Sequence, residues 1–105
     1  MEHSDKIAKE LGIAEGRVKA TAALLADGAT VPFIARYRKE ATGSLDEVAV
    51  GAIRDRLEQL EELDKRRGAI LRSLGERELL ADDLREQLEA AETLAILEDL
   101  YLPFR

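Results

Sequence analysis

Residues 45–74 read LDEVAVGAIRDRLEQLEELDKRRGAILRSL and form the longest segment of regular helical periodicity in the chain. Its apolar residues recur at helical spacing and form one seam, with Asp64 and Arg67 in the gap between its two halves. The members of the seam are Ile53, Leu57, Leu60, Leu71 and Leu74. A glycine costs about 1 kcal/mol relative to alanine inside a helix. We therefore predict one long helix over residues 45–75 and identify Gly68 as the place where it would bend or break.

The flanking segments show the same helical periodicity, and no strand pattern competes with it. The sequence predicts an all-α fold: a helix-turn-helix-like unit over residues 5–27, a short helix after Pro32, the long helix, and a helical pair over residues 82–102. With 105 residues, the chain is expected to form one domain over 1–105.

Local signals suggest where these helices begin and end. Ser4 and Thr93 are expected N-caps, and Ser44 with Glu47 has the spacing of a capping box. Residues 39–44 have the composition of a turn. In the short helix after Pro32, we expect Phe33, Ile34 and Tyr37 to face the core together.

Charge and composition narrow the classes of function. The net charge is −6, and residues 76–105 hold 9 acidic and only 3 basic residues, which argues against a broad duplex-binding surface. The chain has no Cys and one His, and it has no glycine-rich phosphate loop. We therefore expect no enzyme, no catalytic residue, no metal site and no cofactor. No apolar run is long enough to span a membrane, and the N-terminus lacks the plan of a signal peptide, so we expect no membrane partner and a cytoplasmic location.

The N-terminal pair of helices shows a helix-turn-helix spacing. Ala8, Gly12 and Val18 supply the small residue, the turn glycine and the branched apolar residue that this motif needs. On the second helix only Arg17 and Lys19 are basic, and Glu15 would repel phosphate. A structural two-helix unit is therefore favoured over a DNA reader.

A second cluster, Arg36-Tyr37-Arg38-Lys39, places three cations beside one aromatic ring. Such a group can grip phosphate and stack on a base. In the alternative interpretation, the aromatic ring is core and the arginines pair with local acids or helix-end carbonyls. Exposed guanidinium groups would favour the first interpretation, and buried, paired ones the second.

The run VPFIARYRKEATGSLDE, residues 31–47, resembles the N-terminal region of the Tex-like family of bacterial transcription accessory proteins. Other segments resemble the same family and extend the match over nearly the whole chain. They are residues 24–30, 54–67, 89–93 and 97–103.

The resemblance implies a cytoplasmic protein linked to transcription and nucleic-acid metabolism. Tex-like proteins are much longer, and their N-terminal helical region is followed by a resolvase-like domain, a helix-hairpin-helix and an OB-fold that binds RNA. In that family a basic stretch follows the segment matched by residues 100–103. We therefore expect this chain to be a piece of a longer multidomain protein whose main nucleic-acid binder lies elsewhere.

Two functions remain open at this point. The favoured one is a helical scaffold or interaction module that packs on the rest of the protein or on transcription machinery. The alternative is a weak nucleic-acid contact through Arg36, Tyr37, Arg38 and Lys39, with Arg17 and Lys19 nearby. The apolar C-terminal segment further predicts self-association, through Leu97, Leu100, Tyr101 and Phe104.

Overall fold

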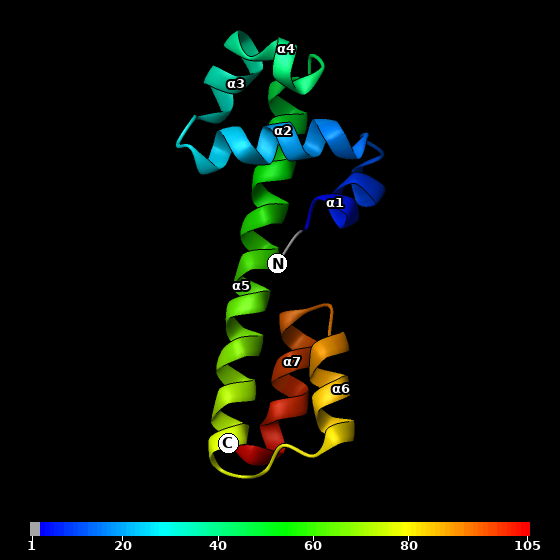
Figure 1. Cartoon of the computed structure of the whole chain (residues 1–105), viewed down its shortest axis with the longest axis vertical. Helices are drawn as coiled ribbons and strands as arrows, with labels where there is room; N and C mark the ends of the chain where they lie inside the picture. Colours follow the sequence, from blue (N-terminus) through cyan, green and yellow to red (C-terminus); the bar gives the residue numbers. More distant parts are fainter. Residues whose placement is uncertain (1–2) are drawn as a thin grey trace. The chain divides into compact units, whose positions relative to one another are not determined.

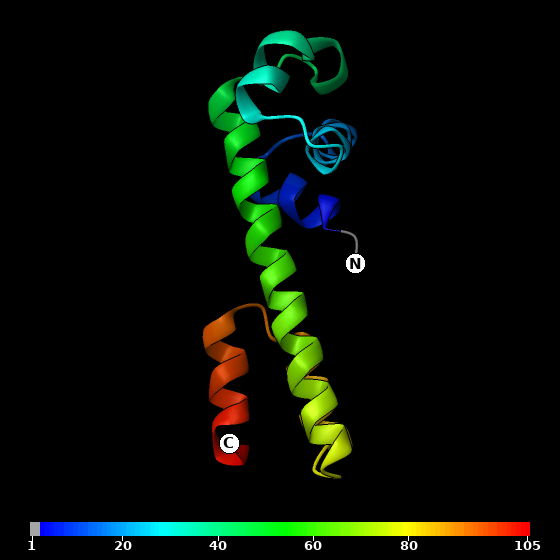
Figure 2. The same ribbon diagram turned by 90° about the vertical axis from the view of Figure 1, so that its left-hand side faces the viewer.

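The computed structural model describes residues 3–105 and confirms the all-α fold. Within that range it contains seven α-helices, one 3₁₀ turn and no strand (Figures 1 and 2). The elements are α1 Ser4–Leu11, α2 Glu15–Ala26, α3 Val31–Tyr37, α4 Lys39–Thr42, α5 Glu47–Glu76, α6 Asp82–Ala90, α7 Leu94–Tyr101 and η1 Leu102–Phe104. In the described part of the chain, none of these helices is both long and apolar enough to cross a bilayer.

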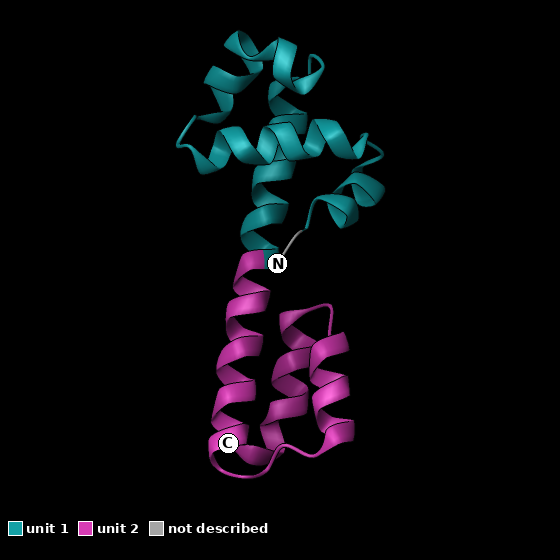
Figure 3. Cartoon of the chain, viewed as in Figure 1, with its two compact units in different colours: residues 1–60 teal, residues 61–105 magenta. Residues whose placement is uncertain are grey.

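The chain divides into two compact units, residues 1–60 and 61–105 (Figure 3). Helix α5 contributes its first part to unit 1 and its second part to unit 2. The prediction of one domain over residues 1–105 stays a prediction, because two compact units can belong to one cooperatively folding domain.

Helix α5 is continuous through Gly68 and ends at Glu76, so the helix neither breaks at Gly68 nor ends at Gly75. It also begins later than expected, and the predicted capping box is wrong. The Asp46 carboxylate accepts a hydrogen bond from the Ala49 amide at 2.8 Å, which makes Asp46 the capping side chain. Ser44 lies two residues upstream with φ +67°, outside the helix.

Unit 1 is built around α2, which crosses the first part of α5, with α1, α3 and α4 packed beside it (Figures 1 and 2). Ser4 is buried inside the first turn of α1 rather than capping it, because the helix already begins with a bond from the Ile7 amide to the His3 carbonyl. The core of this unit consists of Ile7, Val18, Thr21, Ile34, Ala35, Leu45, Val50, Ile53 and Leu60.

The segment after α2 follows its local signals only in part. Gly28 leaves α2 with φ +94°, and the Thr30 hydroxyl accepts from the Phe33 amide at the start of α3. Of the turn predicted over residues 39–44, residues 39–42 form the short helix α4, and only residues 43–44 form a turn. Helix α4 forms because the Arg38 carbonyl accepts from the amides of both Ala41 and Thr42.

Unit 2 consists of the second part of α5 with α6 and α7 alongside it (Figures 1 and 3). The Thr93 hydroxyl caps α7 as predicted, accepting from the Ile96 amide at 3.1 Å. Leu97 is fully buried, whereas Leu94 is 42% exposed. The core of unit 2 consists of Leu63, Ile70, Leu74, Leu88, Ala91 and Leu97.

Candidate interaction surface

Two aromatic rings stand exposed on α3. Phe33 is 46% exposed and Tyr37 67%, and their ring centroids lie 5.5 Å apart with the planes inclined at 47°. The prediction that these rings join Ile34 in the core is therefore wrong, although Ile34 itself is fully buried. A seven-residue helix offers one inward stripe, which Ile34 and Ala35 occupy, while positions 33 and 37 share another face at i,i+4 spacing.

Of the two arginines beside these rings, Arg36 is exposed and Arg38 half-buried, and each lies next to a carboxylate. Arg36 Nη2 is 3.9 Å from Glu47 Oε1, with 68% of the arginine side chain exposed. Arg38 Nε donates to Glu40 Oε1 at 2.7 Å, and this hydrogen bond holds the pKa of Glu40 below its usual value. Lys39 is exposed as well. We call Phe33, Arg36, Tyr37, Arg38 and Lys39 the α3 patch.

The charge of the α3 patch is largely compensated. The pairs with Glu47 and Glu40 are open to solvent, where such ion pairs are weak and easily exchanged. The sequence was compatible with two alternatives for Arg36 and Arg38. They could be exposed, or they could be buried and paired with carboxylates. The structure combines them, since Arg36 is exposed, Arg38 is half-buried, and both have a carboxylate neighbour.

Arg17 is committed to a structural role. Its Nε donates to the Thr42 carbonyl at 3.0 Å and its Nη2 to the Gly43 carbonyl at 2.7 Å, which satisfies backbone acceptors at the end of α4. Gly43 has φ +71°, and a Cβ added there would lie 2.6 Å from Arg17 Nε. The guanidinium therefore closes the turn between α4 and α5.

Lys19, the other basic candidate on α2, lies 3.6 Å from Glu15 within the same helix. Its ion pair is an ordinary i,i+4 surface contact. The structure thus assembles Arg36, Tyr37, Arg38 and Lys39 on one stretch of surface, while Arg17 and Lys19 have other partners.

Long-range arginine contacts are the feature that sequence reasoning missed in unit 1. Arg56 on α5 binds both carboxylate oxygens of Glu10 on α1, at 2.7 and 3.0 Å. The hydrogen bond from Arg56 holds the pKa of Glu10 below its usual value. No local signal marks this pair, because 46 residues separate its members.

Unit 2 contains two further arginine contacts of this kind. Arg67 donates to the Leu88 carbonyl at 2.9 Å, to the Ala91 carbonyl, and to Asp64 at 3.0 Å. It therefore satisfies acceptors at the C-terminal end of α6 while filling the gap in the apolar seam.

Arg66 takes part in the second contact, with α7. It donates to both carboxylate oxygens of Glu98, which Arg105 also contacts. The guanidinium carbons of Arg66 and Arg105 lie 5.4 and 6.0 Å from the ring centroid of Tyr101. This cluster joins α7 to α5 within unit 2.

The described residues include no group of three acidic or histidine side chains placed to hold a metal ion. Two surface features could take part in recognition, the α3 patch in unit 1 and an apolar groove lined by residues 87–100 in unit 2. Both expose apolar side chains that a binding partner could bury.

Comparison with known proteins assigns the chain to a family. The model of the Tex-like protein N-terminal domain matches residues 1–75. The chain belongs to the Tex-like family. Relatives include the "Transcriptional accessory protein Tex" of Neisseria gonorrhoeae, 50% identical over 99 residues, and "Protein tex" of Bordetella pertussis, 49% identical over 100 residues. A protein of Bacillus subtilis, YdcI, is 43% identical over 100 residues.

The alignments with the two Tex proteins cover 94% and 95% of this chain but 13% of each relative, so the chain spans about an eighth of their length. The predicted resemblance to Tex-like proteins is thereby confirmed. All of unit 1, including the α3 patch, falls within the family match, whereas α6 and α7 lie beyond residue 75.

Proposed function

We propose that this chain is a protein-interaction module of a Tex-like transcription accessory protein, and that its α3 patch docks on another part of the longer polypeptide. The observation that carries this proposal is the pair of exposed rings, Phe33 and Tyr37, flanked by arginines that already have carboxylate neighbours. Tyrosine, phenylalanine and arginine are the residues enriched in the cores of protein interfaces.

The electrostatics favour a protein surface over nucleic acid. Phosphate binding depends on basic side chains whose charge is not already balanced. Here Glu47 and Glu40 balance Arg36 and Arg38, and the whole chain carries −6. A protein partner of mixed charge can exchange with these surface pairs at little cost.

The size of the α3 patch favours a tethered partner. An aromatic side chain buries about 150–250 Å², so two rings fall well short of the roughly 800 Å² per partner of a standard independent interface. A partner on the same polypeptide needs less area, because tethering raises its effective concentration to the millimolar range. The length of the Tex relatives leaves ample chain to supply such a partner.

We further propose three properties that the sequence analysis led us to expect. The module is not an enzyme, its α1–α2 pair is a structural helix-turn-helix-like unit, and it works in the cytoplasm. Nucleic acid would then be bound mainly by other domains of the longer protein.

Hydrogen–deuterium exchange tests the docking in a full-length chimera. The matching segment of the Bordetella pertussis relative is replaced by this chain, and exchange is compared with that of the 105-residue chain alone. We expect slower exchange of α3 in the chimera and slower exchange of one segment in the remainder. Exchange of α3 that is the same in both proteins would contradict the proposal.

Two variants test whether the α3 patch causes the slower exchange in the remainder of the chimera. The double substitution Phe33→Ala/Tyr37→Ala should remove the protection of the segment in the remainder. The matched control is Val48→Ala, which truncates an apolar side chain that is 80% exposed outside α3 and should leave that protection unchanged. If both variants lose this protection to the same extent, the α3 patch is not the docking surface.

One observation favours the alternative of a direct nucleic-acid contact. Tyr37 is exposed beside Arg36 and Lys39, which is an arrangement that can stack a base and grip its phosphate. Titrating the 105-residue chain with a labelled single-stranded RNA at several salt concentrations distinguishes the two. The alternative predicts a log–log salt slope of about −0.7 for each phosphate contacted. The interaction-module proposal predicts no resolvable binding.

A further inference from the structure

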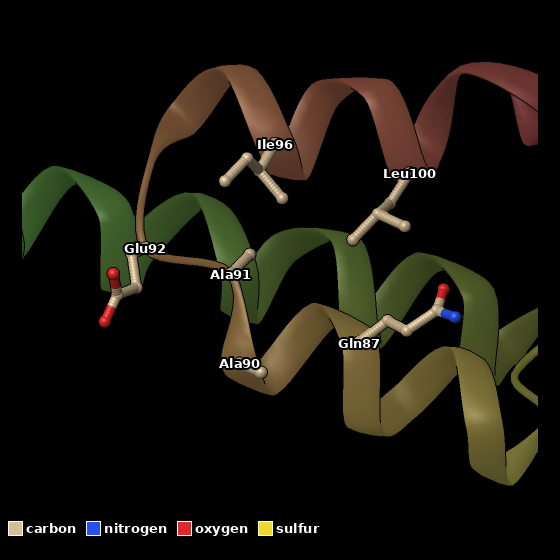
Figure 4. Close-up of a pocket in the computed structure, with 6 residues that line it drawn as sticks. All are labelled: Gln87, Ala90, Ala91, Glu92, Ile96 and Leu100. Atoms are coloured by element: carbon tan, nitrogen blue, oxygen red, sulfur yellow. The ribbon is translucent and has the colours of Figure 1, made fainter.

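An apolar groove lies between α6 and α7 within unit 2 (Figure 4). Its volume is about 410 Å³, and its lining consists of Gln87, Ala90, Ala91, Glu92, Ile96 and Leu100. Ile96 is 46% exposed, so this branched apolar side chain lies open to solvent. The volume falls within the range of pockets that bind ligands or side chains.

The shape of the groove suits a row of apolar side chains. Ile96 and Leu100 are four residues apart, and both project from one face of α7 towards α6 (Figure 4). The opposite wall carries the short side chains of Ala90 and Ala91, which keep the groove open. An amphipathic helix that presents apolar residues at i,i+4 spacing fits such a groove.

We call the acidic residues that helical spacing places beside the lining residues, on both α6 and α7, the rim of the groove. On α6, Asp83 and Glu86 lie one turn before Gln87 and Ala90, and on α7 Asp99 lies three residues after Ile96. All three acidic side chains are exposed. Within residues 3–105 the structure describes no ion pair for any of them, in contrast to Glu40 and Glu47 of unit 1.

We propose that the α6–α7 groove binds a basic amphipathic helix of a partner protein, with its apolar face on Ile96 and Leu100 and its Lys or Arg residues against Asp83, Glu86 and Asp99. Charge complementarity selects this occupant, since an acidic rim attracts a basic helix and disfavours an acidic one. The same rim repels nucleic acid and anionic lipid. The proposal is independent of the docking of α3 and can fail or hold separately.

The test uses the 105-residue chain and a designed peptide of about 15 residues, near the lower length limit for a helix in water. The peptide carries Leu at i, i+4 and i+8 with Lys on the flanking positions. A matched peptide carries Glu in place of Lys, and another carries Ser in place of Leu. Binding is measured by titration calorimetry, and its location by methyl chemical shifts of Ile96 and Leu100.

We expect the Leu/Lys peptide to bind with saturable shifts at Ile96 and Leu100, and both matched peptides to bind at least about tenfold more weakly. Binding of the Glu peptide as tightly as the Lys peptide would overturn the proposal. So would the absence of binding, or binding with shifts elsewhere in the chain. Tighter binding to single-stranded RNA or to phosphatidylserine vesicles, shifting the same methyl groups, would assign the groove to another class of ligand and also overturn it.

Surface variants link the binding to the groove without depending on its core. Reversing two rim charges, Glu86→Lys/Asp99→Lys, should weaken binding about tenfold, because each change replaces an attraction for the basic helix by a repulsion at a solvent-exposed site. The matched control Glu76→Lys makes the same kind of charge change at the end of α5 and should alter binding less than about twofold. Circular dichroism of each variant confirms folding, and equal effects of rim and control variants would contradict the proposed site.

Discussion

The two units secure their helices with the same two devices and differ in what they leave exposed. In each unit, an arginine satisfies the carbonyls at the end of a short helix: Arg17 for α4 and Arg67 for α6. In each unit, an arginine of α5 also binds a distant glutamate, Arg56 with Glu10 and Arg66 with Glu98. The structural arginines are therefore those that contact distant parts of the same unit, whereas Arg36 and Arg38 of the α3 patch have only solvent-accessible carboxylate neighbours.

The exposed surfaces of the two units have contrasting chemistry. Unit 1 presents aromatic rings with arginines next to carboxylates, and unit 2 presents aliphatic side chains of α7 with exposed acidic residues on α6 and α7. The amino-acid composition cannot distinguish these two surfaces, because it does not show which charged side chains are paired and which are not. Substitutions can distinguish the residues that hold the helices of each unit together from those that only form its exposed surface.

The largest expected effect is that of Arg67→Ala in unit 2. The Arg67 side chain is only 14% exposed and donates to two carbonyls and to Asp64. Losing these charged hydrogen bonds should lower the free energy of unfolding by about 2–4 kcal/mol. Urea denaturation measures this change. The control Arg72→Ala removes an exposed arginine of α5 and should change stability by less than about 0.5 kcal/mol.

Gly43→Ala is the corresponding test in unit 1. The positive φ at Gly43 should cost about 1–2 kcal/mol, and the collision of the new Cβ with Arg17 adds to that cost. Gly12→Ala is the matched control, because Gly12 has nearly the same φ of +68° but open space around it. If both substitutions cost the same by thermal denaturation, the Arg17 contact does not constrain this turn.

Acid should weaken both long-range ion pairs. The hydrogen bond from Arg66 holds the pKa of Glu98 below 4.5, and Arg105 adds to this effect. A carboxylate whose pKa is lower in the folded state contributes stability at pH values above its unfolded pKa, and this contribution disappears as the pH falls through the folded pKa. Glu98→Gln should therefore lower Tm at pH 7 and converge with the unchanged chain as the pH falls through the lowered pKa of Glu98.

Glu10→Gln provides the same comparison for unit 1, where the pKa of Glu10 is lowered by its hydrogen bond with Arg56. The two variants should show the same direction of pH dependence. A Tm difference that persists unchanged at low pH would mean that the ion pair is not its source.

The smallest expected effect on stability is that of Tyr37→Ala. With 67% of Tyr37 exposed, the substitution should change the free energy of unfolding by less than about 0.5 kcal/mol. A loss of more than about 1.5 kcal/mol in urea denaturation would instead place the ring in the core, as the sequence pattern had suggested.

Local spacing predicted the helices of this fold, but only some of their ends. The Thr93 cap depends on residues within one turn and was located correctly, whereas the Ser4 cap and the capping box of Ser44 with Glu47 are wrong. Gly68 was a misleading signal, since a helix anchored on both sides by Leu63, Ile70 and Leu74 tolerates one glycine.

Burial on short helices could not be predicted in this way. Phe33 and Tyr37 have the composition of core residues, but the face that a seven-residue helix buries depends on its neighbours in space. The backbone carbonyls that Arg17 and Arg67 contact lie more than 20 residues away along the chain. Leu97 was likewise expected on a self-association surface but is fully buried, so it cannot take part in one, and self-association itself stays a prediction.

Photo-crosslinking from position 37 tests most directly the claim that the α3 patch is a protein-docking surface. Tyr37 is replaced by p-benzoylphenylalanine in the full-length Bordetella chimera, in the presence of single-stranded RNA, with Val48 replaced in a parallel control. We predict an intramolecular crosslink from position 37 to one segment of the remainder, and none to that segment from position 48. Crosslinking from position 37 mainly to the RNA, or equal crosslinking from both positions, would contradict the claim.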